Sequence, residues 1–158
     1  MKIKIAYLAV GWKKNVPIIN KWVRLVEVKE TAQCYVYDGN RKLYKLSDTC
    51  DYAYGVDTNT IYAKENVSDD FLYARLFSNW VTGSYWTMNS AQHTVDNLPS
   101  KIERKETHSA RRSGHWVWIP YDENDLKRAR KNVERWKIRY ANISEMYKTE
   151  YPQYPIDR

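Results

Sequence analysis

The sequence predicts an α+β protein. It has a small antiparallel sheet at the N-terminus, a short core helix and a long C-terminal amphipathic helix packed on them. Apolar and polar residues alternate in short runs before residue 64, which is typical of half-buried strands. Apolar residues then recur every three or four positions over 122–149, which is typical of an amphipathic helix. The 158 residues suit a single compact domain.

The first 64 residues are predicted to be rich in β-strands. Residues 2–8 alternate cleanly, and Gly11 is expected to end this first strand. Asp38-Gly39-Asn40 predicts a hairpin turn within an antiparallel meander over 22–46, since these residue types tolerate positive φ. We expect a curled sheet, with barrel-like closure as an alternative. The further strands are expected at 22–28, 33–37, 43–46, 52–56 and 60–63.

Residues 66–83 predict a short core helix. Ser68 is a suitable N-cap, because its hydroxyl can accept a hydrogen bond from a backbone N–H of the first turn. Gly83 is a plausible C-terminal end of the helix. The next segment, 84–121, is rich in Ser, Thr and Asn and contains a proline. We therefore expect it to be mostly loop, with one short apolar strand at 116–119.

The C-terminal helix is the clearest predicted element. Asp122 can cap it, and Asp125 three residues later resembles a capping box. Tyr151-Pro152 should end it, because the residue before a proline avoids the helical region. A tail over 150–158 follows. We expect the apolar seam of the helix to pack within the chain rather than against a partner helix. The seam residues are Leu126, Ala129, Val133, Trp136, Tyr140, Ile143 and Tyr147.

The side of this helix away from the seam is densely basic. Like charges repeat four residues apart, and each such pair should cost a few tenths of a kcal/mol. Three readings remain open: a solvated or internally paired face, a polyanion site, and a site for an acidic protein surface. We call this surface the basic face. Its residues are Lys127, Arg128, Arg130, Lys131, Arg135, Lys137 and Arg139.

A second polar cluster lies at 108–115. His108, Arg111, Arg112 and His115 could act as an arm that contacts phosphates. Two histidines and an arginine could in principle also cleave RNA, as general base, general acid and phosphate clamp. A flexible basic loop with incidental histidines is commoner than either. We therefore treat these four residues as candidate binding residues and assign no catalytic residue.

Most chemical motifs are missing from the sequence. Cys34 and Cys50 form no CxxC pair and the three histidines lack zinc-ligand spacing, so we expect no metal site. The 5 glycines do not cluster into a phosphate-binding loop, and we expect no cofactor. Asp96 and Glu103 loosely match the spacing of metal-dependent nucleases. A small nuclease is therefore kept as the third alternative.

Charge and aromatic content give the functional expectation. The net charge is +7, and the chain has 14 Tyr and 7 Trp but 2 Phe. The leading hypothesis is a binding protein rather than an enzyme, and this protein contacts DNA or RNA through the basic face and the 108–115 segment. The alternative is an interaction protein or inhibitor that docks on an acidic protein surface, as a small viral protein would. No apolar stretch approaches 18 residues and no signal peptide is evident. We therefore expect no membrane partner and a cytoplasmic location, in the host cytoplasm for a viral protein.

Overall fold

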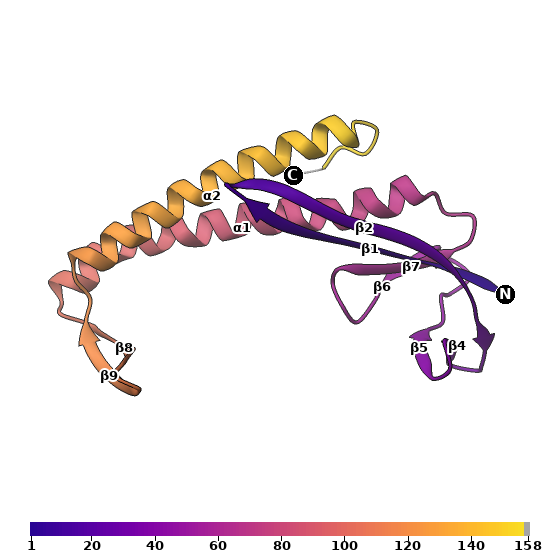
Figure 1. Cartoon of the computed structure of the whole chain (residues 1–158), viewed down its shortest axis with the longest axis horizontal. Coiled ribbons are helices and arrows are strands. Elements are labelled where there is room, and N and C mark those ends of the chain that lie inside the picture. The colour runs from indigo at the N-terminus through magenta and orange to yellow at the C-terminus, as the bar shows by residue number, and fades with distance from the viewer. Residues whose placement is uncertain (157–158) are drawn as a thin grey trace. The chain divides into compact units, whose positions relative to one another are not determined.

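The computed structural model describes residues 1–156, which form two compact units (Figure 1). Unit 1 contains Met1–Val81 and the chain from Ile143 onward, and unit 2 contains Thr82–Asn142. The predicted α+β class is confirmed, with an antiparallel sheet near the N-terminus and a long helix near the C-terminus. The sheet is open, so the barrel-like alternative is wrong. The single compact domain expected from the chain length stays a prediction.

The main sheet of unit 1 is built on one long hairpin. Gly11 lies within its first strand, opposite Ile18, so the predicted end of this strand at Gly11 is wrong. The chain turns instead at Lys14 and Asn15, whose φ angles of 50° and 63° are those of a two-residue hairpin turn. The sheet has the antiparallel order β2-β1-β7-β6. Its strands are β1 (Lys2–Lys13), β2 (Val16–Glu27), β6 (Tyr52–Tyr54) and β7 (Thr60–Lys64).

A separate three-stranded sheet lies between β2 and β6 in the chain. Asp38 and Gly39 have φ angles of 44° and 84°, which confirms the predicted hairpin turn. The meander predicted over 22–46 begins too early, because residues 22–27 belong to β2 and pair with β1. The strands of this second sheet are β3 (Lys29–Glu30), β4 (Cys34–Tyr37) and β5 (Arg41–Tyr44).

Helix α1 (Asp69–Glu103) is 35 residues long, so both its predicted end at Gly83 and the predicted loop over 84–103 are wrong. The predicted N-cap is confirmed, since the Phe71 backbone N–H donates to the Ser68 hydroxyl over 3.0 Å, and the helix begins at Asp69 rather than at residue 66. The helix continues past Gly83 because one side of it still carries side chains that are buried in the fold. Buried and half-buried side chains follow one another at alternating spacings of four and three. They are Phe77, Val81, Ser84, Met88, Ala91, Val95, Leu98 and Ile102.

Helix α2 (Glu123–Glu150) agrees with the prediction to within one residue. The capping box is present: Asp122 and Asp125 each donate a backbone N–H to the other's carboxylate, over 2.9 and 3.0 Å. The seam is buried or half-buried throughout and packs on α1 of the same chain. In unit 2 the rings of Tyr85 and Tyr140 lie 5.5 Å apart, and in unit 1 those of Phe77 and Tyr147 do so.

The core of unit 1 lies between the sheets and the helix ends. Tyr35 and Tyr62 pack with aliphatic side chains of β1 and β2 in one buried cluster. Lys4 of β1 pairs with Asp69 at the start of α1, with Nζ 2.7 Å from the carboxylate. After α2 the chain is irregular from Tyr151 to Ile156. The last two residues of the predicted tail lie outside the described ones.

Candidate interaction surface in unit 2

The segment predicted as a basic loop forms a second hairpin. Strands β8 (Thr107–Arg112) and β9 (His115–Pro120) pair in antiparallel register, so the loop expected over 104–115 is wrong from Thr107 on. Ser113 and Gly114 make the turn with φ angles of 49° and 80°. Ser-Gly is a turn dipeptide, so the sequence does carry a local signal for this hairpin. The short strand expected at 116–119 is confirmed as the centre of β9.

The hairpin has two faces of different character. Side chains two residues apart on a strand share a face, and so do residues directly opposite each other. One face contains His108, Ala110 and Ile119, which are half-buried. The other is fully exposed, and we call it the Trp face. It consists of Thr107, Ser109, Arg111, Trp116, Trp118 and Pro120.

The two tryptophans of the Trp face are the most exposed tryptophans of the described chain. Trp116 is 70% exposed and Trp118 is 74% exposed. Arg111 lies directly opposite Trp116, and Ser109 lies opposite Trp118. The sequence suggested a short apolar strand here without indicating that its indoles face solvent. The strand alternation was visible in the sequence, but nothing in it shows which face another element covers.

The base of the hairpin joins it to α2. The His108 imidazole stacks on the Tyr121 ring at 4.5 Å, and its Nε2 lies 3.7 Å from the Asp125 carboxylate. The Lys101 ammonium of α1 lies 5.2 Å from the centre of the same Tyr121 ring. His108 is therefore a half-buried residue at the root of the hairpin. These contacts hold the two strands against the ends of both helices in unit 2.

The structure does not bring the two histidines together. His108 pairs with Ile119 and His115 pairs with Arg112, which places them four ladder positions apart. At about 3.4 Å for each position they are roughly 14 Å apart along the hairpin. A general acid and a general base must both reach the same phosphodiester within hydrogen-bond distance. This geometry does not favour RNA cleavage by the pair.

The Asp125 carboxylate lies where the hairpin meets α2, and its surroundings shift its pKa. Burial by itself raises the pKa of its carboxyl. The backbone N–H of Asp122 and the guanidinium of Arg128 outweigh that effect, and they hold the pKa below its usual value. Arg128 also pairs with this carboxylate directly. Arg128, one of the predicted binding residues, is thus paired with a carboxylate of the capping box of α2.

The other side chains of the basic face divide into engaged and free groups. Lys137 lies 3.7 Å from the Glu134 carboxylate, and the Arg139 guanidinium lies 5.0 Å from the centre of the Trp136 ring. Partial burial lowers the pKa of Arg139, and the nearby charge of Arg135 lowers it further. Four basic side chains are exposed and make no ion pair with described residues. They are Lys127, Arg130, Lys131 and Arg135.

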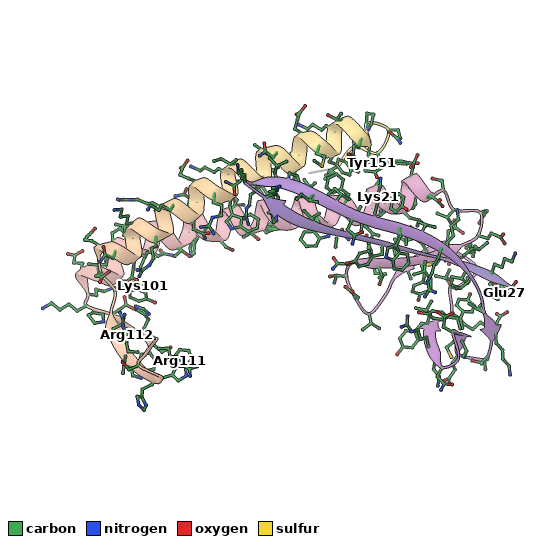
Figure 2. All side chains as sticks on the ribbon, in the orientation of Figure 1. Lys21, Glu27, Lys101, Arg111, Arg112 and Tyr151 are labelled. Atoms are coloured by element: carbon green, nitrogen blue, oxygen red, sulfur yellow. The ribbon has the colours of Figure 1, made fainter. Side chains whose placement is uncertain are left out.

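The positive charge of the protein is concentrated in unit 2. Its 61 residues contain 12 Lys and Arg against 7 Asp and Glu, a net charge of +5 out of +7 for the whole chain. Figure 2 shows Arg111 and Arg112 on the hairpin and Lys101 near the helix ends at its base. Within unit 1, Asp51 pairs with Lys64 and Asp69 pairs with Lys4. Unit 2 carries both the basic face and the exposed Trp face.

The described residues contain no group of three or more His, Cys, Asp or Glu arranged to hold a metal ion. Asp96 accepts a hydrogen bond from Gln92 on the same helix, and Glu103 is the last residue of α1. No family model, curated protein or solved structure matches the chain. None of the helices described is both long and apolar enough to span a membrane.

Proposed function

We propose that this protein binds nucleic acid through the basic face of α2. The observation that carries the proposal is the run of exposed cations at i,i+4 spacing, Lys127, Lys131 and Arg135, that have no ion pair among the described residues. Neighbouring like charges on a helix destabilise it by about 0.2–0.5 kcal/mol per pair. A row of phosphates offsets that repulsion and releases counterions when it binds. The proposal implies a location where the protein meets DNA or RNA, such as the cytoplasm.

The strength of this interaction should depend steeply on salt. If the four free cations each contact a phosphate, the slope of log K against log salt is about −2.8 for a single strand and about −3.6 for a duplex. Raising the salt from about 50 to about 200 mM should then weaken binding roughly 50- to 150-fold. Positively charged side chains in such a row fix the position of the backbone and do not by themselves read sequence.

The test is a titration of fluorescently labelled DNA and RNA, single-stranded and duplex, at these two salt concentrations. We expect binding at low salt with the slope given above. If the protein binds none of the four nucleic acids at about 50 mM salt, the proposal is wrong. A variant with Lys29→Gln and Lys42→Gln is the control for net charge, since both lysines are exposed and belong to unit 1. It should keep the wild-type slope.

A second candidate function is docking on an acidic protein surface, as an inhibitor or adaptor. The exposed Trp116, Trp118 and Arg111 favour it, because Trp and Arg are the residue types enriched in interface hot spots. Affinity capture after nuclease treatment separates the two functions. One stoichiometric protein partner that resists nuclease, together with no binding of pure nucleic acid, would favour docking over the proposed function.

A further inference from the structure

The Trp face of the β8–β9 hairpin exposes two large aromatic rings that no other part of the described chain covers. The side chains of Trp116 and Trp118 make no ring contact or hydrogen bond with described residues, and 70% and 74% of these residues' surfaces are open. On the reverse face, His108, Ala110 and Ile119 near the base are half-buried, whereas Arg112, His115 and Val117 toward the turn are exposed. Two adjacent exposed indoles form an aromatic surface rather than a single stray apolar residue.

The spacing of the two indoles fits stacked nucleobases. Residues two apart on a strand are separated by about 6.6 Å. Successive bases along one strand of a duplex rise by about 3.4 Å, so twice that rise is about 6.8 Å. A strand that carries Trp116 and Trp118 therefore offers room for one base between the two indoles, or for one base on each. Bases paired within a duplex are already stacked and do not offer their faces in this way.

The positive charge of the hairpin favours an anionic partner. Residues 107–120 contain no acid, and they include Arg111, Arg112 and His115. Arg111 lies directly opposite Trp116 on the Trp face, whereas Arg112 and His115 form the last pair of the ladder and point to the reverse face. Positive charge beside aromatic rings complements an anionic backbone with attached bases. A purely aliphatic surface would use only the aromatic rings, and a purely anionic surface would use only the charge.

We infer that the Trp face binds unpaired bases of single-stranded nucleic acid, with Trp116 and Trp118 stacking on the bases and Arg111 near the phosphates. This inference rests on the proposed function and names its substrate class. The two surfaces of unit 2 then have different roles. The basic face of α2 supplies affinity for any phosphate backbone, and the hairpin supplies preference for single strands.

The experiment compares the full-length protein with a Trp116→Ala/Trp118→Ala variant. The probes are an oligothymidylate of about 15 nucleotides, an oligouridylate of the same length, and a mixed-sequence duplex. Trp86→Ala is the matched control, because Trp86 is also in unit 2 and is 63% exposed, but lies on α1. Circular dichroism of each variant shows whether the helices remain folded. A Trp116→Phe/Trp118→Phe variant keeps rings that can stack.

We expect the double alanine variant to bind both single strands about 5- to 150-fold more weakly for each stacked base that is lost. Its affinity for the duplex should stay within about twofold, the Phe variant should recover part of the loss, and Trp86→Ala should bind as wild type. Unchanged single-strand affinity in the double alanine variant overturns the inference, and so does an equal loss for duplex. If the wild type binds none of the probes, the proposed function itself fails.

Discussion

The basic face of α2 should make the protein a better binder at the expense of helix stability, and one double variant tests both effects. Lys131 is flanked at i,i+4 spacing by Lys127 and Arg135, and Arg135 is flanked by Arg139. Replacing Lys131 and Arg135 with Gln therefore removes all three like-charge pairs with two substitutions. Gln has nearly the same helix propensity as Lys and Arg, so propensity should not mask the result.

The two effects have opposite signs. Three pairs at about 0.2–0.5 kcal/mol each give a stabilisation of about 0.6–1.5 kcal/mol at low salt. For a chain of this length that corresponds to a rise in Tm of roughly 1–6 °C. Loss of two phosphate contacts should flatten the slope of log K against log salt by about 1.4 for a single strand and by about 1.8 for a duplex. The variant should thus be more stable and bind more weakly.

Thermal denaturation followed by circular dichroism measures the first effect, and anisotropy titrations at several salt concentrations measure the second. The Lys29→Gln/Lys42→Gln variant removes the same charge from unit 1 and should change neither quantity appreciably. A Lys131→Gln/Arg135→Gln variant with an unchanged salt slope would refute the phosphate contacts. A variant less stable than wild type would refute the idea that these cations repel one another in the free protein.

Three further predictions concern the elements that hold this surface in place. Ile143→Ala should lower the free energy of unfolding in urea by about 2–5 kcal/mol, since Ile143 is fully buried. Ile138→Ala on the same helix should change the free energy of unfolding by no more than about 0.5 kcal/mol, because Ile138 is 48% exposed. Equal losses of stability in the two variants would contradict the burial of the seam. The folded-state pKa of Asp125 is depressed, so its stabilisation is present above the usual carboxyl pKa and lost as the pH falls through the folded value. Asp125→Asn should therefore flatten the acid limb of a plot of Tm against pH, and a limb identical to wild type would contradict this role. Gly114→Ala should destabilise the turn by roughly 1 kcal/mol, since φ is 80° there. It should weaken binding of single strands without weakening binding of the duplex. Equal losses of affinity for both would show that this turn does not position the Trp face.

Some of the fold could be read from local signals. The start of α2 depends on the reciprocal bonds of Asp122 and Asp125, three residues apart, and its end depends on Tyr151-Pro152. The turn at Asp38-Gly39 depends on residue types that tolerate positive φ. Each of these causes acts within a few residues, so the sequence displays it directly.

The second half of α1 shows how composition can mislead where spacing would not. Gly83, Pro99 and many small polar residues suggest a loop, yet the buried positions from Phe77 to Ile102 keep a regular four-three spacing. Helix propensity per residue is a weak preference, and packing of one face against α2 overrides it. The spacing was present in the sequence and would have predicted the longer helix.

For the candidate surface, the charges and the periodicity follow directly from the order of the residues. The sequence places seven cations off the seam of α2, and it shows the alternation of β9 with two tryptophans. That Trp116 and Trp118 remain in solvent while His108 is half-buried at the base of the hairpin depends on how the hairpin packs. The alternation of a strand fixes which residues share a face, but which face is covered depends on neighbours distant in the sequence. Here the helix ends lie on one side of the hairpin and leave its Trp face open.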